Sequence, residues 1–282
     1  MFLQNNENRS VADFFPHDIG LFLSHGFYIH NDLFKKVYQF MHYSIIIPAY
    51  NEEELLPKTL EAINKAMAGI GRYSGEVVVT NNNSTDRTAE IACEYGAKVV
   101  FESFQQISRS RNVAAIAAKG KYLIFTDADT IISRELIEKS LDLMASGDVC
   151  AGGALVEFIN SDLQTKKLSK WWNVFTRKMK VACGAYIFCH KKDFIEVGGF
   201  NEKIYASEEI WFGRKLKKLA RKRHQKFIIV SIPIQTSARK MEWFSPWQLF
   251  WQVLPMIFCP WLVRSKRFCD LWYKRPEIKE KK

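Results

Sequence analysis

Several marks of other protein classes are missing from this 282-residue sequence. Its six cysteines form no Cys-x-x-Cys pair, and its histidines show no paired zinc-ligand spacing, so neither a zinc site nor a disulfide framework is predicted. The start, MFLQNNENRS, has neither the basic residues nor the apolar run of a signal peptide. No repeat of solenoid period is evident. We therefore expect a cytoplasmic protein, in a reducing compartment.

Long apolar runs are also scarce. The stretch from Trp247 to Val263 has about the minimum length of a bilayer span, but two prolines and two glutamines interrupt it. Its tryptophans and the basic residues that follow suit a segment lying in the membrane interface. The alternative is a tail packed on the protein's own surface. We favour the interface, at the inner face of the cytoplasmic membrane.

Charge is unevenly distributed along the chain. Residues 1–159 carry 14 Lys and Arg against 20 Asp and Glu, a net charge of −6, whereas residues 160–282 carry 27 against 10, a net charge of +17. A strongly basic half predicts an anionic partner. Anionic lipid and nucleic acid both fit this charge.

From Tyr43 onward, short β-branched runs alternate with helical patterns. Four strand-then-helix units in a row predict an α/β fold with a mostly parallel sheet and helices on both faces. The expected strands cover residues 43–50, 76–82, 98–103 and 121–130, and the expected helices follow them at 53–68, 84–96, 111–120 and 133–147.

After residue 150 the alternation becomes less regular, which is typical of a substrate-binding half. WWNVFTRK, residues 171–178, is expected to be a basic and aromatic loop. SEEIWFGRKLKKLARKR predicts a helix with Ile210, Leu216 and Leu219 inward. The predicted organisation is an extension or mis-set start (1–42), one domain of two halves (43–130 and 131–240) and a Trp-rich basic tail (241–282).

Two carboxylates end the fourth predicted strand, in the sequence FTDADT. In an extended strand, residues i and i+2 point to the same side, so Asp127 and Asp129 are expected to face one way. Like charges held that close need a cation or hydrogen-bond donors, and a divalent metal with oxygen ligands supplies the former. A solvated strand end is the alternative.

Other polar clusters follow the first two predicted strands. PAYNEE ends the first strand and NNNSTD the second. Ligands of parallel sheets bind beyond the carboxyl ends of the strands, where these clusters and the acidic pair are expected to meet. This convergence favours a ligand site over a solvated strand end.

Six segments in order resemble the family 2 nucleotide-sugar glycosyltransferases, which have the GT-A fold. They are SIIIPAYNEEELLPKTL, NNNSTDRT, RSRN, TDADT, VGGFNE and SEE, and they lie between Tyr43 and Lys240. The resemblance implies a nucleotide-binding half at 43–130 and an acceptor half at 131–240. It also implies that the loop after the first strand holds the nucleotide. Its residues Pro48, Ala49, Tyr50 and Glu52 would line the base and the ribose.

The resemblance also assigns residues to the base and the phosphates. Asn82, within Asn81–Asn83 where the family usually has Asp-Asp or Asp-Asn, would face the base. The departure leaves the base open, with UDP favoured over GDP. Arg111 would reach the nucleotide phosphates, because a guanidinium group suits phosphate oxygens. An exposed arginine at a helix start is the alternative.

The same resemblance implies roles for the acidic residues. Asp127 would lie on the ribose side, and both Asp127 and Asp129 would hold Mg²⁺ or Mn²⁺ against the sugar diphosphate. Glu209 would be the general base for the acceptor hydroxyl. Glu208 would either support the base residues from behind or contact the acceptor, because adjacent helical residues do not point the same way. The family has Asp where this chain has Glu209. A helix-start acid stabilised by the dipole is the alternative.

The acceptor side is predicted from VGGF. Gly198 and Gly199 would allow close approach of the acceptor sugar. The RxxRW-like motif of processive relatives is missing, and Arg239 and Lys240 are an alternative diphosphate contact.

These assignments predict an inverting glycosyltransferase acting on a glycan or lipid-linked acceptor with peripheral membrane contact and no nucleic acid. A sugar nucleotidyltransferase is less favoured because PAYNEEELLPK lacks a glycine-rich phosphate loop. A non-catalytic basic module that binds membrane or nucleic acid is the remaining alternative.

Overall fold

The computed structural model describes residues 41–159, 163–237, 260–269 and 273. The predicted extension lies outside these residues except for its last two positions. So do Arg239, Lys240 and most of the predicted tail. In the described part of the chain, no helix is both long enough and apolar enough to cross a membrane.

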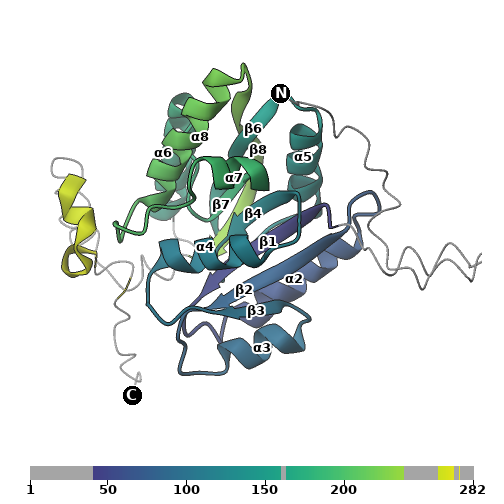
Figure 1. Cartoon of the computed structure of the whole chain (residues 1–282), viewed down its shortest axis with the longest axis vertical. Coiled ribbons are helices and arrows are strands. Elements are labelled where there is room, and N and C mark those ends of the chain that lie inside the picture. The colour runs from purple at the N-terminus through teal and green to yellow at the C-terminus, as the bar shows by residue number, and fades with distance from the viewer. Residues whose placement is uncertain (1–40, 160–162, 238–259, 270–272, 274–282) are drawn as a thin grey trace, which may run out of the picture. The chain divides into compact units, whose positions relative to one another are not determined.

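One eight-stranded sheet forms the centre of the fold, in the order β3-β2-β1-β4-β7-β6-β8-β5 (Figure 1). The first four strands run parallel to one another, β7 is antiparallel to both of its neighbours, and β6 and β8 are parallel. The strands are β1 (Tyr43–Ala49), β2 (Gly75–Asn81), β3 (Lys98–Phe101), β4 (Tyr122–Thr126), β5 (Thr130–Ile131), β6 (Val149–Ile159), β7 (Tyr186–His190) and β8 (Lys226–Ser237).

Helices cover both faces of this sheet, as the alternating pattern predicts. They are α2 (Leu56–Ala68), α3 (Thr88–Glu94), α4 (Ile107–Ala117), α5 (Arg134–Ala145), α6 (Leu163–Met179), α7 (Lys191–Glu196) and α8 (Glu208–Lys222), followed by the short 3-10 helices η3 (Pro260–Arg264) and η4 (Lys266–Phe268). The predicted parallel sheet with helices on both faces is confirmed.

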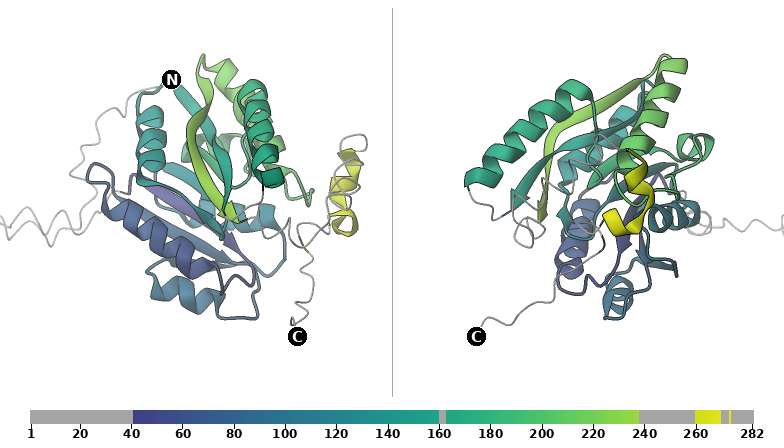
Figure 2. Two further views of the ribbon diagram at one scale, coloured as in Figure 1. Left: turned by 180° about the vertical axis from the view of Figure 1, so that it is seen from behind. Right: turned by 90° about the vertical axis from the view of Figure 1, so that its left-hand side faces the viewer.

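Strand β1 shows why both faces are covered. Ile45 and Ile47 belong to the apolar cluster that α2, α3 and α5 complete, whereas Ile46 belongs to the cluster on the other face with α4, α7 and α8. Successive strand residues point to opposite faces, so a continuous apolar run can be stable only between two layers of helices. Figure 2 shows the same sheet from behind and from the side.

The predicted loop at residues 171–178 is wrong, because these residues lie within the 17-residue helix α6. No glycine or proline interrupts Leu163–Met179, so nothing in the backbone opposes a helix there. Helix α8 lies where it was predicted, with Leu216 and Leu219 buried. Ile210 is only half-buried, and Phe212 takes the buried position in its place.

Candidate active site

The carboxylates Asp127 and Asp129 lie in a turn after β4 and not in an extended strand. β4 ends at Thr126, and the Thr130 amide donates to the Asp127 carbonyl oxygen at 3.3 Å. The strand alternation invoked to align the two acids therefore does not apply, because their backbone has already turned. Asp127 keeps 35% of its side chain exposed, and Asp129 is half-buried.

Arg111 connects this turn to helix α8. Its guanidinium Nη1 donates to Glu208 Oε1 at 2.7 Å, and its Nη2 donates to Asp127 Oδ1 at 2.9 Å and to the Gly184 carbonyl at 3.0 Å. The side chain is buried in the second turn of α4, which excludes the alternative of an exposed arginine at a helix start.

Charge keeps this buried arginine ionised. Burial opposes the cationic form, but the nearby carboxylates Asp127 and Glu208 outweigh it and hold the pKa of Arg111 above its usual value. In the described structure its guanidinium therefore faces carboxylates, and its Nε has no hydrogen-bond partner. This network is the electrostatic centre of the site.

Helix α8 begins with the two predicted acids. Glu208 is buried against Arg111, whereas the neighbouring Glu209 is half-buried and lies beside Gly184. Burial, and after it repulsion from Glu208, raises the pKa of Glu209 to about 8. A carboxyl group with a raised pKa is a stronger proton acceptor once ionised, which suits a general base near neutral pH.

Two loops at the carboxyl edge of the sheet hold each other in place. The Asn51 amide donates to Ser84 Oγ at 3.0 Å, and the Glu52 amide donates to Thr88 Oγ1 at 2.8 Å. Asp86 accepts from the Glu53 amide at 3.1 Å. The loop after β1, which contains Tyr50 and Glu52, is thereby fixed to the loop after β2. Tyr50, Glu52 and Pro48 are half-buried, and Ala49 is buried.

Asn82 uses its amide group on the protein itself. Its Nδ2 donates to the carbonyl oxygens of Glu102 and Phe104 at 2.9 and 2.8 Å, and its Oδ1 accepts from the Gln106 amide at 3.0 Å. The side chain of Asn82 is buried and makes three hydrogen bonds, so it holds the 102–106 loop in place. This bonding does not leave the amide open towards a base.

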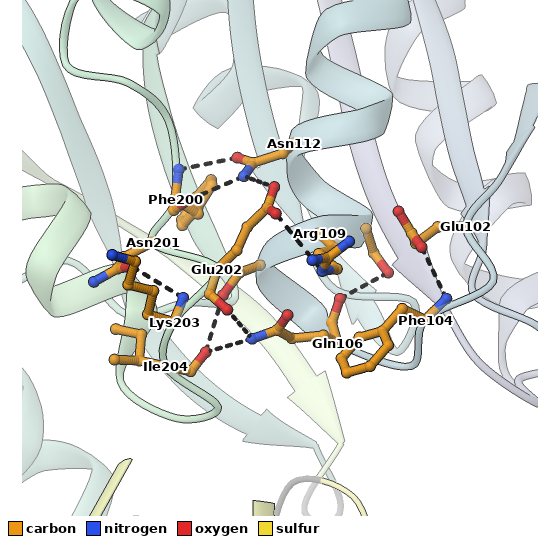
Figure 3. Close-up of polar contacts among 12 residues, drawn as sticks. Glu102, Phe104, Gln106, Arg109, Asn112, Phe200, Asn201, Glu202, Lys203 and Ile204 are labelled. Atoms are coloured by element: carbon orange, nitrogen blue, oxygen red, sulfur yellow. Dashed lines mark hydrogen bonds and ion pairs between the residues drawn. The ribbon is translucent and has the colours of Figure 1, made fainter. Parts of the chain in front are cut away.

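The start of α4 is joined to the segment that precedes α8 (Figure 3). Gln106 Nε2 donates to the carbonyl oxygens of Glu202 and Ile204 at 2.8 and 2.9 Å. Asn112 donates to the Phe200 carbonyl at 3.0 Å and accepts from the Phe200 amide at 2.9 Å. These contacts set the position of the chain just before Glu208.

Gly198 and Gly199 end helix α7, with φ values of +71° and +58°. A Cβ at Gly199 would come within 2.7 Å of Asn112 Oδ1, whereas a Cβ at Gly198 would meet nothing within 4 Å. The observed close approach at Gly199 is therefore to the protein's own Asn112. An approach by a sugar stays a prediction.

A C-terminal contact fits the alternative of a tail packed on the protein's own surface, although sequence reasoning did not name the residue pair. The Tyr205 amide donates to the Val263 carbonyl at 2.6 Å, and Tyr273 packs on Tyr205 with ring centroids 5.8 Å apart. Burial, and after it the charge of Glu208, raises the pKa of Tyr273 above its usual value. Tyr273 is separated by 68 positions from Tyr205, so no local pattern marks the pair.

The donor set suits a hard divalent cation. Asp127 and Asp129 offer carboxylate oxygens, and Mg²⁺ or Mn²⁺ typically binds one or two such groups together with phosphate oxygens. Within the described residues, no group of three or more His, Cys, Asp or Glu side chains could hold a metal by itself. The residues therefore fit a cation that is shared with a phosphate ligand.

Sequence comparison finds similar proteins that are named as glycosyltransferases. The chain is 26% identical over 184 residues to the glycosyltransferase AglE of Haloferax volcanii, covering 61% of this chain and 60% of that protein. It is 32% identical over 98 residues to the dolichyl-phosphate beta-glucosyltransferase of Drosophila melanogaster, covering 30% of each. The chain thus spans less than two thirds of these relatives.

Solved structures share the fold. The mannosyltransferase PcManGT from Pyrobaculum calidifontis, in complex with GDP-Man and Mn²⁺, matches with a TM-score of 0.60 at 18% identity, over 83% of this chain and 66% of that one. Staphylococcus aureus TarS 1–349 with UDP-GlcNAc matches with a TM-score of 0.56 at 20% identity, over 71% and 59%. The expected GT-A fold is confirmed.

The family itself is identified by sequence. The model of glycosyl transferase family 2 matches residues 44–194, which is more than half of the chain. The match spans the first loop, the Asp127–Asp129 turn and Arg111. This chain belongs to glycosyl transferase family 2.

Proposed function

We propose that this protein transfers a sugar from a nucleoside-diphosphate sugar to an acceptor hydroxyl with inversion at the anomeric carbon. The observation that carries the proposal is the Arg111 network, which places the Asp127 turn and the α8 acids around one guanidinium group. A glycosyl transfer needs acids for the donor's cation and a base for the acceptor, and this network brings both sets together.

The donor would bind at the carboxyl edge of the sheet. The loop of Pro48, Ala49, Tyr50 and Glu52 would receive the nucleoside, because its attachment to Ser84 and Thr88 gives it a fixed shape before the ligand arrives. Asn82 would act through the 102–106 loop that it holds. UDP stays favoured over GDP; among the structural matches, one was solved with UDP-GlcNAc and another with GDP-Man.

Asp127 and Asp129 would hold Mg²⁺ or Mn²⁺ beside the diphosphate. When bound, such a cation offsets the negative charge that develops on the departing nucleoside diphosphate. Arg111 would hold Asp127 in place and supply a fixed positive charge close to the same phosphates.

Glu209 would take the proton of the acceptor hydroxyl. The acceptor oxygen then attacks the anomeric carbon as the bond from that carbon to the diphosphate breaks. A single displacement of this kind inverts the anomeric centre. Glu208, fixed by Arg111, would keep the first turn of α8 in position. Gly198 and Gly199 would lie on the acceptor side.

A lipid-linked or membrane-surface glycan is the acceptor class that the net charge of +17 over residues 160–282 favours. One relative is by name a dolichyl-phosphate beta-glucosyltransferase, which supports an acceptor of this class. We place the reaction at the inner face of the cytoplasmic membrane.

A binding panel tests the proposal. The purified chain is titrated with UDP-, GDP- and dTDP-sugars, with and without Mn²⁺ or Mg²⁺. We expect one donor to bind only with metal, Asp129→Ala to abolish that binding, and the exposed-acid control Asp148→Ala to retain it. If none of these donors binds with either metal, the proposal is wrong. The anomeric configuration of the product, read by NMR, tests inversion.

A further inference from the structure

Helix α6 is amphipathic in the reverse of the usual sense. Its side against β6 carries the polar residues Ser169, Asn173 and Thr176, and the Asn173 side chain bonds both the amide and the carbonyl of Val156, at 3.0 and 2.9 Å. These three residues are spaced i, i+4 and i+7, so they occupy one helical face. The apolar residues must therefore lie elsewhere on the helix.

The outward side carries large apolar groups. Trp171 is 64% exposed, Val174 65%, Phe175 37% and Met179 53%. Their spacing of i, i+3, i+4 and i+8 makes one continuous stripe opposite the polar face. Trp171 and Phe175 stack with centroids 6.1 Å apart and planes 10° apart, which shows a preformed aromatic surface. The right-hand view of Figure 2 shows α6 at the outer edge of the described molecule.

The charged side chains in the sequence of this helix are all cationic. Between residues 163 and 180 there are six Lys and Arg side chains, all exposed, and no Asp or Glu. Lys217 of α8 donates to the Met179 carbonyl at 3.1 Å, so the second basic helix, with seven Lys and Arg from Arg214 to Arg223, adjoins the end of α6. A protein partner would have to supply a matching apolar groove and an acidic rim.

We infer that the outward face of α6, defined by Trp171, Val174, Phe175 and Met179 with its flanking lysines, docks on a bilayer surface that contains anionic lipid. Aromatic rings enter the region between headgroups and acyl chains, while basic side chains bind lipid phosphates beside them. The stripe provides the apolar contact and the lysines provide the charge attraction.

Docking at α6 would bring the membrane close to the base. Five residues after α6 ends at Met179, the Gly184 carbonyl accepts from Arg111, and Gly184 lies beside Glu209. A hydroxyl carried at the bilayer surface could therefore approach Glu209. This consequence for the acceptor rests on the proposed function, whereas the docking itself does not.

Vesicle binding by the full chain tests the inference. Co-sedimentation is measured with vesicles of phosphatidylcholine alone and of phosphatidylcholine mixed with phosphatidylglycerol. We expect binding to the mixed vesicles only, a loss of at least about tenfold for the double variant Trp171→Ser with Phe175→Ser, and no loss for Ile116→Ser. Ile116, 71% exposed on α4, is the matched apolar control. Unchanged melting temperatures show that the variants fold.

Hydrogen exchange locates the contact. We expect mixed vesicles to protect the amides of residues 163–180. Equal vesicle binding by the double variant, protection confined to residues 238–282, or binding to single-stranded oligonucleotides that mixed vesicles do not displace would each overturn the inference. Vesicle binding as expected in a protein that binds no nucleotide sugar would support the docking and contradict only the transferase proposal.

Discussion

The Arg111 guanidinium binds one carboxylate 16 positions along the chain and another 97 positions along it. Sequence reasoning named all three residues, but it aimed Arg111 at phosphates and could not pair it with Glu208. Pairing across that distance depends on α4 packing against β1 and β2 and on α8 packing against β6 and β8, which no local pattern records. Sequence reasoning could name these three residues, whereas it could not predict their contacts with one another.

Replacing Arg111 removes the cation that pairs with two buried or partly buried carboxylates. We expect Arg111→Met to lower the free energy of unfolding by about 3–5 kcal/mol, the cost typical of removing one partner from a buried ion pair. Urea denaturation measures it. The matched control is Arg109→Met, because Arg109 is partly exposed, lies 3.6 Å from Glu202 and should cost about 1 kcal/mol or less. Equal losses in the two variants would contradict the central role of Arg111.

Glu209 makes stability depend on pH. Because its pKa is raised to about 8, the folded protein holds a proton that the unfolded chain releases near its ordinary value of 4.5. The contribution of protonated Glu209 to the free energy of unfolding is fully present below pH 4.5 and is lost as pH rises through about 8. Glu209→Gln keeps a neutral group there at every pH.

The variant should therefore gain stability relative to the native protein as pH rises. We expect a gain of about 1–2 kcal/mol between pH 5 and 9, after allowing for partial exposure and for the charge shared with Glu208. Denaturation curves at several pH values measure it. Glu135→Gln, an exposed acid in the first turn of α5, should show no such trend. A flat difference for Glu209→Gln would remove the evidence for a raised pKa.

At the scale of elements, regular strand-and-helix units were predictable and irregular connections were not. Apolar runs bounded by turn residues placed the first four strands within a few residues. The Asp127–Asp129 turn was taken for strand because both acids follow the run directly. Helix α6 was taken for loop because its apolar residues face outward, so they give no sign of packing against a core.

The hydrogen bonds between the loop after β1 and the loop after β2 are expected to support donor binding. Asp86 accepts from the amides of Glu53 and Thr88 at 3.1 and 3.0 Å. We expect Asp86→Ala to lower the free energy of unfolding by about 1–3 kcal/mol and to weaken donor binding, since the loop with Tyr50 and Glu52 loses one of its attachments. Calorimetric titration measures the second effect. Glu90→Ala, an exposed ion-pair residue on the adjoining α3, should change neither by more than about 1 kcal/mol.

At the scale of the whole molecule, the described C-terminal residues pack against the segment that precedes α8. Val263, Cys269 and Tyr273 join Ile204 and Ala206 in a small apolar cluster immediately before α8. The predicted division at residue 240 places these contacts in the tail. We propose that this part of the tail helps to hold the start of α8.

Tyr273 tests that dependence. Tyr273→Ala removes a ring packed on Tyr205, and we expect a loss of about 1–3 kcal/mol in stability together with reduced turnover. Tyr273→Phe keeps the ring and removes only a hydroxyl that accepts from the Ile107 amide at 3.4 Å, so it should cost less than about 1 kcal/mol. Full activity in Tyr273→Ala would show that α8 does not need the tail.

The proposed role of Glu209 is that of the base in a metal-dependent glycosyl transfer. Its most direct test compares donor affinity and turnover of the native protein with those of Glu209→Gln, using the donor that the binding panel identifies and saturating Mn²⁺. We expect an unchanged dissociation constant and turnover lower by at least about 100-fold. Native turnover in Glu209→Gln would contradict it and would assign the proton transfer to another residue.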